Sequence, residues 1–162
     1  MSDLPIADIF SVRTAFTDLI QKKLSASMIQ KIVDFCYLHR QFYEELFLLL
    51  MENLASTPPM NRLNVFYVLD SLCKHSSKYQ FYGYSDQIMA QIDEISLLVV
   101  DPKSEDGAAN VYQLRKVLSL WKSKSILRNE SFERVDSFLK GILEKVLETL
   151  TIVKIKFINT NR

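Results

Sequence analysis

The sequence predicts an all-α fold of seven or eight helices, and three observations support that prediction. Only three glycines and four prolines occur in 162 residues, too few for the many turns of a sheet sandwich or barrel. Apolar residues recur at steps of three and four over long stretches, which is the helical period. Hydrophobic residues make up 48% of the chain, which is ample for one packed core.

The first half of the chain is predicted to form four helices, over residues 6–24, 28–39, 41–55 and 61–77. Apolar side chains recur at the helical period from Ile9 to Ile20 in the first of these. Ser27 is expected to cap the second helix. The third helix is expected to stop before Pro58 and Pro59, which cannot continue it.

The second half is predicted to form three longer helices. Residues 79–84 are expected to form an aromatic turn, after which Ser85 caps a helix that reaches residue 100. Residues 101–107 are the clearest loop and leave room for one short helical turn. Helices over residues 110–124 and from Asn129 or Ser131 to Val153 complete the pattern, and Gly141 lies inside the last one.

The end of the chain is apolar and β-branched over residues 151–158. Such a stretch needs a packing partner, or it lies where a longer chain was cut. We expect one helical domain over residues 1–158, followed by a tail over residues 159–162 that was cut from a longer chain.

The predicted helix over residues 61–77 is apolar nearly all round, which indicates an inner helix. Its polar side chains form one stripe of Tyr67, Asp70 and Lys74. A stripe of this kind suits a groove that offers a hydrogen-bonding group to a peptide. We expect deep burial on this helix and on the helix over residues 110–124, at Phe66, Leu69, Leu118 and Trp121.

Charge and cysteine usage exclude several classes of protein. Twenty Lys and Arg residues against 19 Asp and Glu residues give a net charge of +1, so no nucleic-acid partner is predicted. Cys36 and Cys73 lie in apolar helical stretches and are expected to be buried free thiols. No window approaches the roughly 18 apolar residues of a membrane span, and we expect no membrane partner.

Catalytic and metal-binding motifs are weak in this sequence. His75 lies one helical turn from Ser71, but Asp70 points about 100° away from the serine around the helix and cannot orient that histidine. Cys73 and His75 face apart, which argues against a zinc site with Cys36 and His39. Phosphate-binding glycine loops and standard metal motifs do not occur. The sequence therefore predicts no enzyme, no metal and no cofactor.

Two stretches carry a resemblance to a known family. LNVFYVLDSLCK over residues 63–74 and VYQLRKVLSLWKSKSIL over residues 111–127 resemble the fourth and seventh helices of CTD-interacting domains. The resemblance implies a right-handed superhelix, related to the ENTH and VHS folds, that binds the heptads of the RNA polymerase II tail. It implies that Asp70 hydrogen-bonds a bound peptide. Lys116 stands where the family's phosphoserine-contacting arginine is typical, so weak binding of phosphorylated heptads is predicted.

The opening VRTAFTDLIQKKLSAS, over residues 12–27, is similar to that of the gamma subunits of the fungal RNA polymerase II CTD kinase complex. This closer resemblance implies a nuclear, non-catalytic domain that supports a cyclin and a cyclin-dependent kinase. The alternatives are a phospho-CTD reader from a termination or 3′-end processing factor, and an ENTH- or VHS-type trafficking adaptor.

Two groups of residues are the predicted sites. The peptide-groove candidates are Tyr67, Asp70, Lys74, Arg115 and Lys116, and an ordinary solvated face is the alternative for the last two. Partner contacts are expected at the aromatic turn and at the loop over residues 101–109, because exposed aromatic clusters are common interface anchors. The aromatic contact candidates are Phe81, Tyr82 and Tyr84.

Overall fold

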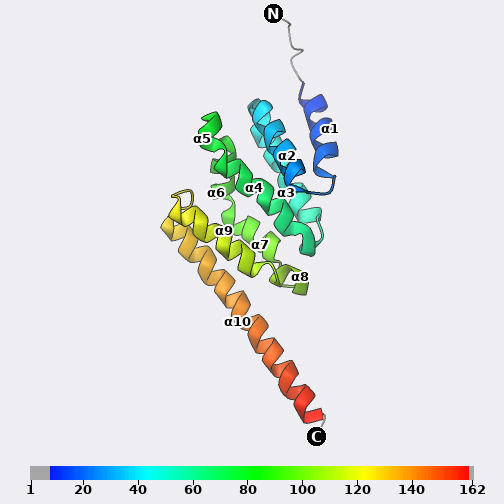
Figure 1. Cartoon of the computed structure of the whole chain (residues 1–162), viewed down its shortest axis with the longest axis vertical. Coiled ribbons are helices and arrows are strands. Elements are labelled where there is room, and N and C mark those ends of the chain that lie inside the picture. The colour runs from blue at the N-terminus through cyan, green and yellow to red at the C-terminus, as the bar shows by residue number, and fades with distance from the viewer. Residues whose placement is uncertain (1–7, 161–162) are drawn as a thin grey trace, which may run out of the picture. The chain divides into compact units, whose positions relative to one another are not determined.

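A computed structural model describes residues 8–160 of the chain, and all of its regular elements in that range are helices (Figure 1). The chain divides into two compact units, residues 1–91 and 92–162. The first contains α1 (Ile9–Ile20), α2 (Ala26–Leu38), η1 (Arg40–Phe42), α3 (Tyr43–Ser56), η2 (Pro59–Asn61), α4 (Arg62–Lys74), α5 (Ser76–Tyr79) and α6 (Gly83–Ala90). The second contains α7 (Ile92–Val100), α8 (Glu105–Ala108), α9 (Val111–Ser123) and α10 (Asn129–Thr160).

The predicted all-α class is confirmed, with differences in detail. Two of the α-helices, α5 and α8, have only four residues, which leaves eight longer ones in the described range. The predicted helix from residue 85 to residue 100 is split, because Gln91 leaves helical geometry with φ −115° and ψ 19°. No glycine or proline marks that break in the sequence.

Helix caps explain two further differences. The side chain of Asp8 caps α1 by accepting a hydrogen bond from the Ser11 amide, and the predicted start at residue 6 lies outside the described residues. Ser25, rather than Ser27, caps α2 by accepting from the Met28 amide. Both serines can cap a helix, and Ser25, which has extended backbone geometry, takes the cap position.

Helix α4 is the inner helix of the first unit, as predicted, and it packs against α2, α3 and α6. Phe66 and Leu69 are completely buried on it. Its apolar residues face several neighbours at once, so burial on more than one side follows from the sequence pattern. Cys36 and Cys73 are buried free thiols, as expected.

A cluster of aromatic rings joins α2, α3 and α6 within the first unit. Tyr37 stacks on Tyr79 at 4.3 Å between centroids, and Phe81 meets the edges or faces of Tyr43 and Tyr84. Tyr84 donates a hydrogen bond to the Cys36 carbonyl at 2.7 Å. The ring bodies supply apolar contact, and the hydroxyls of the two fully buried tyrosines, Tyr37 and Tyr84, donate to backbone carbonyls.

The second unit is organised by α9 and α10, which lie side by side and both contact α7. Leu118 and Trp121 on α9 are completely buried, as predicted. The side-chain amide of Asn110 donates to the Val99 carbonyl at 2.8 Å and so ties the start of α9 to the end of α7. The loop between them contains the single turn α8, as the sequence allowed.

Helix α10 is much longer than the part of it that is buried. Val135, Leu139 and Ile142 are buried on its first half, whereas Leu150 and Phe157 in its second half are 60% and 67% exposed. Among the described helices, none has the length and apolar character that a bilayer crossing demands. The predicted domain boundary after residue 158 lies within α10 and stays a prediction, and residues 161–162 of the predicted tail lie outside the described range.

Gly141 gives a direct test of the α10 geometry. A Cβ atom built at this position meets nothing within 4 Å, and glycine is about 0.8–1 kcal/mol less favourable than alanine inside a helix. We expect Gly141→Ala to raise the free energy of unfolding by about 0.5–1 kcal/mol, measured by urea denaturation.

Gly83→Ala is the control for that measurement. A Cβ at Gly83 would lie 2.6 Å from Cζ of Phe81 and 2.9 Å from a ring carbon of Tyr43, so this change should destabilise the protein. Destabilisation by Gly141→Ala would contradict the open helical environment of that glycine.

Candidate functional site

A surface pocket of about 220 Å³ lies between α9 and α10, within the second unit. Helix α9 supplies one wall and α10 the other. The lining combines two aromatic rings, a hydroxyl, two cations and one carboxylate, in the residues Tyr112, Arg115, Lys116, Ser119, Phe132 and Asp136. Two of the predicted groove residues, Arg115 and Lys116, therefore do lie in one concave site.

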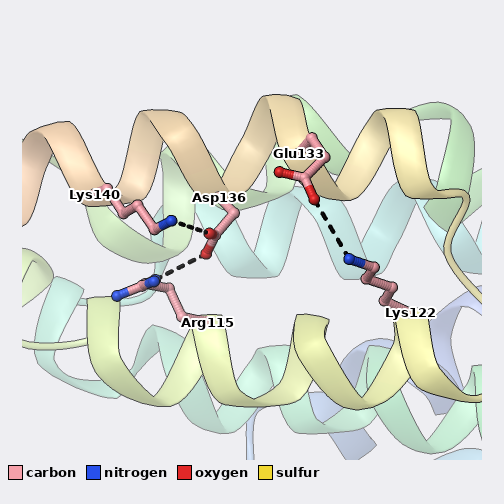
Figure 2. A network of polar contacts seen from close by, with 5 residues as sticks. All are labelled: Arg115, Lys122, Glu133, Asp136 and Lys140. Atoms are coloured by element: carbon pink, nitrogen blue, oxygen red, sulfur yellow. Dashed lines mark hydrogen bonds and ion pairs between the residues drawn. The ribbon is translucent and has the colours of Figure 1, made fainter.

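A carboxylate holds the two walls of this pocket together. Arg115 Nε donates to Asp136 Oδ1 at 2.8 Å, and Lys140 Nζ lies 3.3 Å from Asp136 Oδ2 (Figure 2). The side chain of Asp136 is only 9% exposed, against 31% for Arg115. One carboxylate thus serves two cations, one from each helix.

Helical spacing explains why these groups meet. Asp136 and Lys140 are four residues apart on α10 and so lie on the same side of that helix. Val135 and Leu139 beside them are buried, so the packing of α10 carries Asp136 into the interface with α9. There it needs a partner, because an uncompensated buried charge is costly, and Arg115 supplies one.

The ionisation of Asp136 follows from these contacts. Burial alone would raise the pKa of its carboxyl group, but hydrogen bonds from Arg115 and Lys140, together with their positive charges, outweigh burial and lower the pKa. Asp136 is therefore ionised at neutral pH. The lining of the pocket therefore includes one negative charge.

A second ion pair crosses the same helix interface and is much more exposed. Lys122 Nζ lies 3.4 Å from Glu133 Oε1, with the two side chains 37% and 65% exposed (Figure 2). The Lys122 ammonium also lies 4.6 Å from the centroid of the Phe132 ring. This pair is one turn of α10 away from Asp136 and does not involve Arg115.

The remaining groove candidates lie on α4 in the first unit. Asp70 is 7% exposed, and its Oδ2 lies 2.8 Å from Nζ of Lys74. Tyr67 is half-buried and Lys74 is exposed. Their role in binding a peptide together with Arg115 and Lys116 stays a prediction.

The aromatic contact candidates differ in exposure. Tyr82 is 52% exposed, but Tyr84 is completely buried, and Phe81 packs its ring against Tyr43 and Tyr84. The expectation of an exposed cluster was wrong for Tyr84, because its hydroxyl finds a backbone acceptor inside the first unit. Only Tyr82 presents most of its ring to solvent.

The residues weighed for catalysis have structural contacts. His75 Nδ1 lies 2.7 Å from the Ser71 carbonyl oxygen, which can only accept, so Nδ1 carries a proton and cannot take one from the Ser71 hydroxyl. Burial raises the pKa of both Cys36 and Cys73, which keeps these thiols protonated. Within residues 8–160, no cluster of three or more His, Cys, Asp or Glu residues is placed to hold a metal ion.

Sequence reasoning missed four residues that line the pocket, of which Asp136 is the charged one; the others are Tyr112, Ser119 and Phe132. The signal for Asp136 was a single carboxylate on the buried side of the last helix, next to Val135 and Leu139 and one turn before Lys140. The identity of its partner on α9 could not be read from spacing, because it depends on the register in which the two helices pack.

Comparison with known proteins places this site in a context. The family of CTD kinase subunit gamma CTK3 matches residues 7–128. The CTD kinase subunit gamma of Schizosaccharomyces pombe is 30% identical over 129 residues, which span 78% of this chain and 58% of that relative. The chain thus corresponds to little more than half of that relative's length.

Two solved structures share the fold. A CTD-interacting domain of Ctk3, described as an unconventional one, superposes with a TM-score of 0.76 at 27% identity and covers 83% of this chain and 96% of that one. The CTD-interacting domain of Seb1 from Schizosaccharomyces pombe gives a TM-score of 0.68 at 16% identity, with 84% and 98% covered. These matches confirm the fold class predicted from the two resembling helices.

The ionisation of Asp136 generates a pH-dependent prediction. A carboxyl group whose pKa is lower in the folded state stabilises the protein above its unfolded pKa of about 3.9, and this contribution disappears as the pH falls through the folded value. We expect Asp136→Asn to lower the free energy of unfolding by about 1–2 kcal/mol at pH 7, and this loss should become smaller as the pH falls below about 3.9. Urea denaturation of both proteins between pH 2.5 and pH 7 measures this.

Glu133→Gln is the matched control, since it removes the same charge from the same helix. Its ion pair is exposed, so its cost should stay within about 0.5 kcal/mol at every pH. A loss for Asp136→Asn that does not change with pH would contradict the assignment of a lowered pKa.

Proposed function

Because the chain belongs to the CTD kinase subunit gamma family, we propose that it forms the non-catalytic interaction domain of an RNA polymerase II CTD kinase complex. In that role it supports the assembly, stability and activity of a cyclin-dependent kinase and its cyclin, and it acts in the nucleus during transcription elongation. The kinase and cyclin are the partners, and no cofactor is required of this domain.

The observation that carries the proposal is the family match over residues 7–128, which includes α9 and most of the described helices. The contacts of the charged side chains and of His75 also support the proposal. The Arg115–Asp136 ion pair joins α9 to α10, the Lys140–Asp136 pair lies within α10, and His75 contacts the backbone of its own helix. Groups arranged in this way stabilise a scaffold and leave no nucleophile paired with a base.

A second function, the reading of phosphorylated heptads, is favoured by one observation. Lys116 is exposed on the wall of a pocket that also contains Arg115. Two features argue against the reading of phosphorylated heptads. Lysine lacks the planar group of two parallel donors with which arginine binds phosphate, and Arg115 already forms an ion pair with a carboxylate of the protein. A domain of this kind would contact the polymerase tail only weakly.

We expect singly phosphorylated heptad peptides to bind more weakly than about 100 μM, which corresponds to about 5.5 kcal/mol or less of binding free energy. The net charge of +1 provides almost no long-range attraction to add to the weak local site. Titration of a fluorescent two-heptad peptide measures this. Low-micromolar binding that Lys116→Ala abolishes would support the phosphopeptide reader instead.

For the kinase scaffold, we expect an exposed aromatic residue to matter more than the α4 stripe. Tyr82→Ala should weaken co-purification of the kinase and cyclin, because interface aromatics often contribute 2 kcal/mol or more. Tyr82→Phe keeps the ring and is the control. Phe81 is left unchanged, since its ring packs inside the first unit.

Asp70→Asn, which keeps the shape of the buried side chain, tests the groove in the same co-purification and kinase assay. We expect it to leave complex assembly and kinase activity within about twofold of the unchanged protein. If Asp70→Asn abolished activity while Tyr82→Ala had no effect, the groove would be functional and the proposed contact surface wrong.

A further inference from the structure

We propose that Asp136 is a selectivity residue, an internal carboxylate that occupies Arg115 and thereby keeps phosphate out of the α9–α10 pocket. The proposal deepens the proposed function, because it accounts for a kinase-complex domain that does not retain the phosphorylated tail. It concerns only residues of the second unit and depends on the proposed function for the choice of peptide probe.

The first step is the geometry of Arg115. A guanidinium binds an oxyanion best through two parallel N–H donors, and one of its two side-on edges uses Nε. Arg115 Nε already donates to Asp136 Oδ1 at 2.8 Å. The edge of Arg115 that includes Nε is therefore taken by a ligand belonging to the protein itself.

The second step is charge. Asp136 lines the pocket, so any anion in this pocket sits close to a carboxylate that is itself only 9% exposed. Repulsion between like charges grows as solvent is excluded. The lowered pKa of Asp136 means that protonation does not relieve this repulsion near neutral pH.

The third step concerns the positive charges that remain near the pocket when the carboxylate of Asp136 is neutralised. Arg115 and Lys116 line the pocket, and Lys140, on the next turn of α10, would lose its ion-pair partner. Two positive charges would then line a cavity of about 220 Å³, with the ammonium of Lys140 beside the neutralised residue. That is the composition of a phosphate site, and a single side chain separates it from the present state.

The comparison of Asp136→Asn with Glu133→Gln tests this proposal on the whole chain. Both variants remove one negative charge from α10 and one ion pair to α9, but only Asp136 contacts Arg115 (Figure 2). The probes are a two-heptad peptide with one phosphoserine and the same peptide without phosphate. Binding is followed by chemical-shift perturbation with up to 1 mM peptide, at about 0.05 M and 0.5 M salt.

We expect Asp136→Asn to raise the affinity for the phosphorylated peptide about 3- to 30-fold at low salt, which is the range that one nearby charge gives in a partly solvated site. The gain should shrink at high salt and be absent for the unphosphorylated peptide. Glu133→Gln should change either affinity less than twofold.

Three results would overturn the proposal. Equal gains for both variants would mean that only net charge matters. No gain for Asp136→Asn at 1 mM peptide would mean that the carboxylate does not mask the pocket. Weaker binding would mean that Asp136 positions Arg115 for an anion.

A double variant separates the role of Arg115 from any loss of stability, because it contains the same change at Asp136. Adding Arg115→Gln to Asp136→Asn should remove the gained affinity, because the unmasked donor is then gone. If the double variant binds the phosphorylated peptide as well as Asp136→Asn does, Arg115 is not the masked group. Failure of this test leaves kinase co-purification unaffected, so it can be told apart from failure of the proposed function.

Discussion

The buried charge of Asp136 is the constraint around which the second unit is arranged. Packing of Val135 and Leu139 carries this carboxylate into the interface between α9 and α10, where solvation is poor and a partner is needed. Arg115 meets that need from α9 and Lys140 from α10 itself. The observed register of the two helices places Asp136 beside Arg115, so packing in another register would leave the buried carboxylate without its partner on α9.

The first unit also buries polar groups in its aromatic cluster, but these groups are neutral. Its aromatic cluster buries tyrosines, and their hydroxyls donate to backbone carbonyls, as Tyr84 does to Cys36 and Tyr37 does to Leu72. Burial raises the pKa of Tyr37 to about 12, so it stays a donor at any physiological pH. Contacts of this kind do not titrate, whereas the Asp136 contact does, and acid should weaken the second unit before it weakens the aromatic cluster.

Much of this architecture could be predicted from periodicity, and the exceptions have physical reasons. The complete burial of Phe66 and Trp121 agrees with the apolar stripes on which the two residues lie. The break at Gln91 has no glycine or proline as a local signal, and it coincides with the boundary between the two compact units. The pairing of Arg115 with Asp136 depends on helix register, and two residues 21 apart in sequence give no hint of it.

The proposed masking of Arg115 has a consequence for the function of the domain. Lys116 stands where the resemblance places a phosphate-contacting residue, and the neighbouring Arg115 has the carboxylate of Asp136 as its anion. The carboxylate of Asp136 is part of the protein and so is always present at the site. A phosphate group could bind there only by displacing this carboxylate from Arg115 or by lying beside its negative charge. A subunit that must stay with its kinase while the kinase acts on many heptads benefits from weak product binding, because a tightly held phosphorylated tail would slow release. The proposed masking of the pocket is thus compatible with the proposed scaffold role, and it requires only one acidic side chain at this turn of α10.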